Sequence, residues 1–146
     1  MTTTFQADLT SARSDLDAAR AELITVVQSL NDADLEAARR GGWTIARVLH
    51  HVIQGDTYYT GTIGYLSENP RPTNMPPSAP ASVSDAIQQL EAAGAAFRSA
   101  LESVGEDAFY TVKPVAHEEF SVLSLLENVT HHDREHAAQI QTILSA

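Results

Sequence analysis

The chain has 146 residues, no cysteine and a formal net charge of −10, which together exclude several classes of protein. Its length suits one domain, residues 1–146, that buries its own core, and the lack of cysteine excludes a thiol nucleophile or a Cys-ligated zinc. The acidic balance argues against binding to nucleic acid or to anionic membranes. No signal-like N-terminus and no membrane-length apolar run are present, so we expect a cytoplasmic protein.

Two long helices are predicted in the first half of the chain. Apolar residues recur at helical spacing over about residues 5–30 and again over about residues 44–67. Between them, residues 31–34 (Asn-Asp-Ala-Asp) are suited to capping a short turn, and Gly41-Gly42 breaks the chain before Thr44, a suitable N-cap. No segment of the chain shows a convincing strand pattern.

A proline-rich segment separates the two halves. Residues 69–82 contain five of the six prolines, which prevents regular structure and predicts a long extended connection. We interpret it as a crossover between distant ends of two helices, as found in bundles that do not simply alternate up and down. A mobile lid is the alternative, and no residue favours it.

Two further helices complete the predicted fold. The third is capped by Ser82 or Ser84, continues to about Val104 and is ended by Gly105, and the fourth begins near Ser121. Four amphipathic helices of this length predict an all-α fold, a four-helix bundle with a long Pro-rich crossover between helices 2 and 3.

The most informative pair of residues lies on the fourth predicted helix. His132 and His136 are four residues apart, so their side chains lie one above the other and can converge on one metal ion. Both lie on the same side as the apolar stripe, whereas His131 points away. Two imidazoles on the core side need polar partners. The alternative is a hydrogen-bonded pair without metal, and a third ligand is needed to decide.

The second predicted helix supplies two candidates for that ligand, His50 and His51. Both lie beside the apolar stripe rather than at its centre, so periodicity separates them weakly. Val48 and Gly55 flank His51 on its edge of the helix and predict a partly enclosed niche, which favours His51.

Two segments resemble the signatures of a known family. Residues 43–52, WTIARVLHHV, resemble the pattern W-[ST]-h-x-[ED]-h-h-x-H-h of the DinB-like superfamily, where h is hydrophobic and the histidine eight residues after the tryptophan binds metal. Residues 132–140, HDREHAAQI, resemble its second signature, H-x-x-x-H-x-x-Q-h. The resemblance therefore implies three metal ligands: His51, His132 and His136. Arg47 stands where the family commonly has an acidic residue.

The resemblance also implies a chemistry. Three neutral imidazoles suit a divalent transition metal, Zn or Ni, and leave a coordination position free. Relatives include S-transferases that use bacillithiol or mycothiol, so a low-molecular-weight thiol is the expected co-substrate and a small electrophile the expected substrate. The alternative is a non-catalytic metal- or small-molecule-binding protein that sequesters its ligand. A purely structural bundle is a third interpretation. A homodimer is compatible with the amphipathic helices, and relatives often dimerise.

Several other side chains have two interpretations. Asp133 falls on the buried stripe. One interpretation is functional: it orients a ligand imidazole or acts as a base beside the metal. The other is structural: its carboxylate is hydrogen-bonded to Thr, Tyr or backbone groups of another helix. Trp43, Tyr58 and Tyr59 either line a substrate pocket or pack against the core. Residues 117–119, His-Glu-Glu, are interpreted as a solvated turn rather than a ligand cluster. Gln139 is either a pocket group or a hydrogen-bonder in the core.

Overall fold

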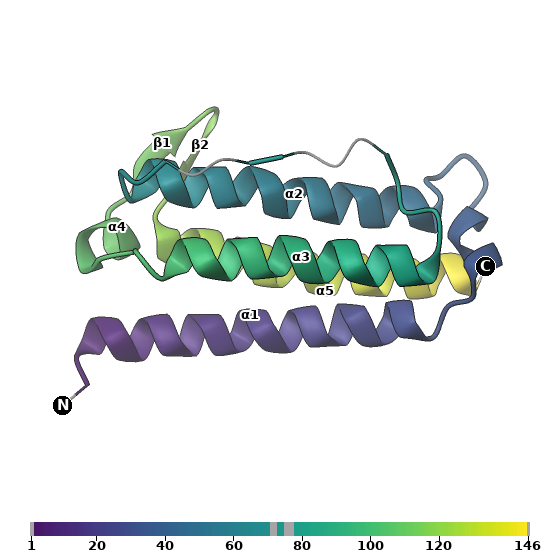
Figure 1. Ribbon diagram of the computed structural model, residues 1–146, viewed down its shortest axis with the longest axis horizontal. Helices are drawn as coiled ribbons and strands as arrows, with labels where there is room; N and C mark the ends of the chain where they lie inside the picture. The colour runs from purple at the N-terminus through teal and green to yellow at the C-terminus, as the bar shows by residue number, and fades with distance from the viewer. Residues whose placement is uncertain (1, 71–72, 75–77, 146) are drawn as a thin grey trace.

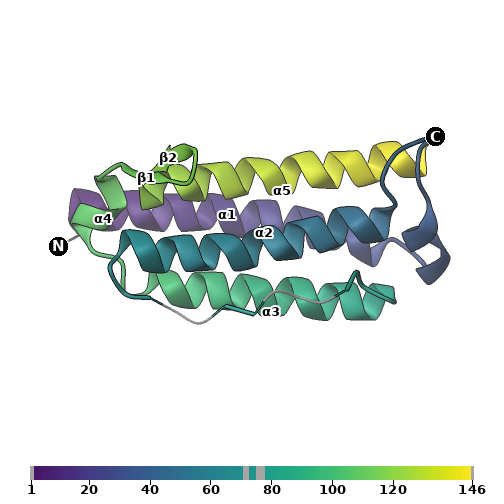
Figure 2. The same ribbon diagram turned by 90° about the horizontal axis from the view of Figure 1, so that it is seen from above.

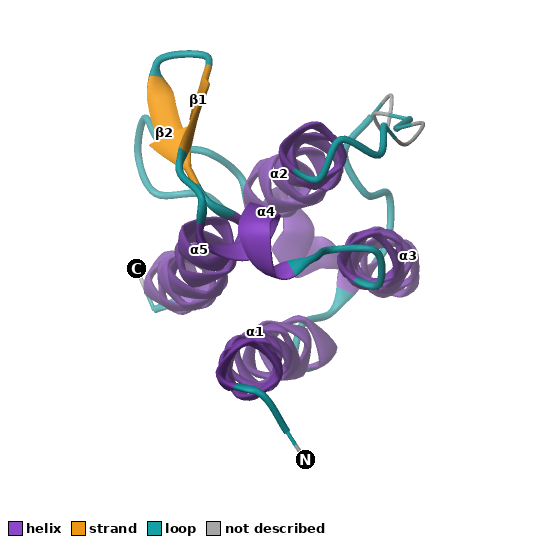
Figure 3. Cartoon of the chain, turned by 90° about the vertical axis from the view of Figure 1, so that its left-hand side faces the viewer, coloured by secondary structure: helices purple, strands orange, loops and turns teal. Residues whose placement is uncertain are grey.

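A computed structural model describes residues 2–70, 73–74 and 78–145 of the chain. Four long helices run along its length (Figure 1), with these bounds: α1 Thr4–Gln28, α2 Ile45–Leu66, α3 Val83–Leu101 and α5 Val122–Leu144. Seen end-on, they surround a common axis (Figure 3). The predicted all-α four-helix bundle is confirmed.

The helices begin where the sequence predicts. Thr44 and Ser82 act as N-caps, each accepting a hydrogen bond from a backbone N–H three residues along, and Ser121 does the same for α5. Asn31 caps a single short 3-10 helix, η1 (Asp32–Glu36). Gly41 adopts a φ of +74°, the left-handed conformation that favours glycine, in the turn before α2.

The connection between α2 and α3 joins opposite ends of the bundle. In Figures 1 and 2, α2 ends beside the β1–β2 end of the molecule, whereas α3 begins at the far end, beside η1. This is the arrangement that a crossover requires. Residues 71–72 and 75–77 of the predicted segment 69–82 lie outside the described residues.

Two expectations for the connection between α3 and α5 are wrong. Gly105 does not end α3, which stops at Leu101; it precedes a further short helix, α4 (Glu106–Tyr110). The chain also contains a small antiparallel hairpin, β1 (Lys113–Val115) with β2 (Glu118–Phe120), in register Lys113↔Phe120, although no strand is predicted. Phe120 is buried and anchors this hairpin to the bundle.

The core is divided into two apolar clusters along the bundle. Leu23, Leu49 and Ile140 belong to the cluster at the η1 end, and Leu16, Ile63 and Leu126 are among those at the hairpin end. Three buried charged side chains lie at the level between the clusters: Arg20 of α1, Asp56 of α2 and Asp133 of α5. This level also carries the candidate site.

Candidate metal centre

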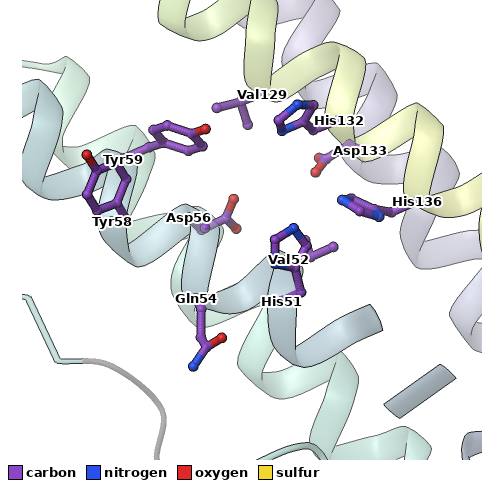
Figure 4. Close-up of a pocket in the computed structure, with 11 residues that line it drawn as sticks. His51, Val52, Gln54, Asp56, Tyr58, Tyr59, Val129, His132, Asp133 and His136 are labelled. Carbon is purple, nitrogen blue, oxygen red and sulfur yellow. The ribbon is translucent and has the colours of Figure 1, made fainter. Parts of the chain in front are cut away.

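Three histidines from two helices surround one cavity between α2 and α5. The cavity has a volume of about 460 Å³, and His51, His132 and His136 line it. The ring centroids of His51 and His136 are 5.1 Å apart, and those of His132 and His136 are 6.1 Å apart. The structure therefore brings the three predicted ligands together (Figure 4). His50, the competing candidate, is not among the residues that line the cavity.

The three rings differ in their surroundings. His51 lines the cavity but is more exposed than His132 and His136, which are half-buried. Burial, together with His136 and His132, lowers the pKa of His51, which favours the neutral imidazole that a metal requires.

Gln139 fixes the ring of His136. Its Oε1 lies 2.9 Å from Nδ1 of His136. Because an amide oxygen only accepts, this contact favours the neutral tautomer with the proton on Nδ1, in which Nε2 keeps a free lone pair. Gln139 is thus a partner of a candidate ligand, on the solvent side, rather than a hydrogen-bonder in the core.

The spacing of the rings is compatible with a shared ion. Two imidazoles that bind one tetrahedral ion through nitrogen at about 2.0–2.1 Å have ring centroids about 5 Å apart. As the side chains stand, however, no three His, Cys, Asp or Glu side chains within residues 2–70, 73–74 and 78–145 are arranged to hold a metal ion. The neighbouring rings lie edge to face, at interplanar angles of 77° and 69°.

A buried charged triad, Arg20–Asp56–Asp133, lies against this cavity. Nε of Arg20 donates to Oδ2 of Asp133 at 2.8 Å, and Nη2 donates to Oδ1 of the same carboxylate at 3.1 Å. Nη2 also donates to Oδ1 of Asp56 at 3.0 Å, and Nη1 donates to the backbone oxygen of Leu90 in α3 at 3.2 Å. A single side chain of α1 therefore binds all three other long helices.

The triad changes the interpretation of Asp133. Its carboxylate is 2% exposed, and both oxygens accept from Arg20 rather than from the Thr, Tyr or backbone groups considered for it. An arginine that is paired in this way fixes the aspartate side chain in place. The tentative role of Asp133 as a catalytic base stays a prediction.

Arg20 and Asp56 are residues of this region that were not predicted from the sequence. Arg20 lies between Leu16 and Leu23 on the apolar side of α1, and Asp56 follows Val52 at helical spacing on α2. A charged residue on an apolar stripe is the signal that could have found both.

Aromatic side chains border the cavity. Tyr58 and Tyr59 line it, with ring centroids 5.4 Å apart, and Asn128 donates a hydrogen bond to the Tyr59 hydroxyl at 3.2 Å. Trp43 is not a lining residue, but its ring lies edge to face with that of His51, with ring centroids 5.4 Å apart. The guanidinium carbon of Arg47 lies 4.4 Å from the centroid of the Trp43 ring. Residues 117–119, which lie in and beside β2, are exposed and do not line the cavity.

Comparisons with known proteins identify the family. The family model for the DinB superfamily matches residues 15–140, so the chain belongs to this superfamily. A crystal structure of a DinB-like protein from Bacillus cereus ATCC 10987 is similar in fold, with a TM-score of 0.71 and 18% sequence identity over 99% of this chain and 93% of that one. No curated protein matches the sequence. No described helix is long and apolar enough to cross a membrane.

Proposed function

We propose that the protein binds one divalent transition metal ion, Zn or Ni, through His51, His132 and His136. The observation that carries the proposal is the meeting of these three rings at one cavity, from α2 and α5. Imidazole nitrogen is a suitable ligand for both metals, and three protein ligands leave a position for a further group. Rotation of the side chains about their χ angles supplies the change that convergence on an ion requires.

The other residues of the site prepare the histidines for this role. Gln139 holds the proton of His136 on Nδ1 and so presents Nε2. Asp133 is the neighbour of His132, and its pairing with Arg20 fixes that stretch of α5 against α1 and α2. The cavity leaves room beside the rings for a small molecule.

We further propose that the site is catalytic and transfers a low-molecular-weight thiol to a small electrophile. A bound Zn or Ni ion lowers the pKa of a thiol, which supplies a thiolate nucleophile near neutral pH. The chain has no cysteine of its own, so the thiol comes from outside. His51 is exposed, which leaves the candidate ligands open to such a molecule.

Metal analysis of matched variants tests the site. The protein is loaded with Zn or Ni, dialysed and analysed by mass spectrometry as wild type, His132→Ala and His131→Ala. The control removes an adjacent histidine whose side chain is 70% exposed and pairs with Glu135. We expect one ion per chain in the wild type and the control, and a loss of at least tenfold in affinity in His132→Ala. Equal, negligible metal in all three rejects the proposal.

Activity is tested separately on the metal-loaded protein. Bacillithiol or mycothiol is mixed with monochlorobimane, in which the thiolate sulfur bonds to carbon as chloride leaves, and adduct formation is followed by fluorescence. Turnover above that of the His132→Ala variant supports the transferase. Tight binding of thiol without turnover favours the alternative, a protein that sequesters its ligand.

A further inference from the structure

The wall of the histidine cavity carries an excess of negative charge. Asp56 and Asp133 both line it, and none of its described lining residues is a lysine or an arginine. Arg20, which pairs with both carboxylates, contributes one positive charge against two negative ones. Burial acts to lower the pKa of Arg20, but the two aspartates together raise it above its ordinary value, so the guanidinium stays charged.

Asp56 is the less compensated of the two carboxylates. Asp133 accepts two hydrogen bonds from Arg20, whereas Asp56 accepts one. Oδ2 of Asp56 forms an ion pair with Nη2 of Arg20 at 2.8 Å, but it is buried and accepts no hydrogen bond among the described residues. Burial raises the pKa of Asp56 to about 6 in spite of Arg20, so the group is mostly ionised at pH 7.5.

The aromatic side chains occupy the other end of the cavity. In Figure 4, the three histidines lie toward one side, Tyr58 and Tyr59 toward the opposite side, and Asp56 between them. Tyr59 is held by Asn128 and by an edge-to-face contact with Phe120, with ring centroids 6.3 Å apart. A fixed aromatic ring attracts a cation to its face through its quadrupole.

These features discriminate between ligands by charge. A carboxylate or phosphate at the tyrosine end would lose hydration without gaining a cationic partner, which is costly. An ammonium group would be attracted by the net negative charge of the Arg20–Asp56–Asp133 triad and by the aromatic rings that line the cavity. The cavity volume of about 460 Å³ is suited to a small organic molecule.

We propose that the tyrosine end of the histidine cavity binds a small organic cation, an amine or quaternary ammonium on an apolar body, in preference to an anion of the same shape. The inference rests on the proposed function in taking this cavity as the substrate site, and it adds the charge class of the substrate. The attraction comes from the chain's own side chains, so it is present without a metal ion.

Binding of three matched probes tests the proposal. Benzylamine, benzyl alcohol and phenylacetate are titrated into the full-length protein at pH 7.5 with EDTA, by calorimetry and by the fluorescence of Trp43, the single tryptophan, which lies beside His51. We expect benzylamine to bind at least tenfold more tightly than phenylacetate, with benzyl alcohol between them. Phenylacetate binding as tightly as benzylamine, or no probe binding at millimolar concentration, overturns the proposal.

A pair of charge variants assigns the preference to the cavity. Asp56→Asn removes one of the two negative charges of the triad, and Asp17→Asn makes the same change in net charge at a surface ion pair with Arg98. We expect Asp56→Asn to reduce the preference for benzylamine over phenylacetate at least threefold, and Asp17→Asn to leave it unchanged. Equal effects of the two variants show a general effect of protein charge and overturn the assignment.

A pair of tyrosine variants tests the aromatic end. Tyr58→Leu and Tyr65→Leu both replace an exposed tyrosine of α2, but only Tyr58 lines the cavity. We expect Tyr58→Leu alone to weaken benzylamine binding, by about threefold. If neither variant weakens binding, the cation does not lie at these rings. Because the titrations contain EDTA, cation binding by a protein that takes up no metal overturns the proposed function alone.

Discussion

Two arginine–carboxylate pairs join α1 to α5, and they differ chiefly in burial. Arg20 and Asp133 are 2.8 Å apart with side chains 6% and 2% exposed, whereas Arg134 and Glu22 are 3.2 Å apart with side chains 48% and 57% exposed. In water the ions lose little when separated, but in the core each needs its partner. The same two helices thus carry one pair that the fold depends on and one that it can lose.

Removal of Arg20 is expected to have the largest effect. Arg20→Met leaves Asp56 and Asp133 buried without their shared cation, and the free energy of unfolding should fall by about 3–5 kcal/mol. Urea denaturation monitored by circular dichroism measures the change. A loss below about 1 kcal/mol would show that the two carboxylates are rehydrated or protonated at little cost, and the contrast between the pairs would disappear.

The pH dependence of Asp56 gives an intermediate effect. Because burial raises its pKa from 3.8 to about 6, the folded protein binds a proton more tightly than the unfolded chain. The contribution of this group to stability is therefore complete below pH 3.8 and is lost as the pH rises through about 6. The difference between these two pKa values corresponds to a change on the order of 3 kcal/mol in the free energy of unfolding.

Asp56→Asn isolates this contribution, since an amide does not titrate. Unfolding free energies of the wild type and the variant are compared at pH 4.5 and pH 7.5. We expect the stability of the variant relative to the wild type to be higher at pH 7.5 than at pH 4.5. A difference that is independent of pH would mean that Arg20 compensates Asp56 fully.

The surface pair is expected to contribute least. Arg134→Met removes the contact with Glu22, but both ions are well hydrated, and the free energy of unfolding should change by about 0–1 kcal/mol. The same denaturation measurement applies. A loss comparable with that of Arg20→Met would show that helix pairing, rather than burial, determines the energy of these contacts.

The sequence predicts the long helices well because their signals are local. Thr44, Ser82 and Ser121 are polar caps directly before apolar periodic segments, and each caps a helix in the structure. The hairpin has no such signal. Its turn at Ala116 adopts a φ of 55° without the Asn-Gly or Gly that marks short hairpin turns, and its strands have three residues each.

The site is predictable in part for the same reason. The spacing of His132 and His136 and the family signature at His51 lie in the sequence, and the three rings meet at one cavity. Asp133 is recognisable as a carboxylate on an apolar stripe, but its partner Arg20 is 113 residues away in the chain. No local pattern connects residues at such a separation, so the triad emerges only when the helices are packed.

The reach of Arg20 to α2, α3 and α5 has a consequence for how the molecule opens. Without α1, Asp56 and Asp133 would lose their shared cation, and the apolar faces of the other three helices that pack on α1 would be exposed to water. We therefore expect no subset of the helices to be stable alone. Amides in α1 should exchange with deuterium through the same cooperative unfolding as those of α2 and α5, and α1 should not unfold separately. Shortening the chain from its first residue past position 20 should abolish the native state outright.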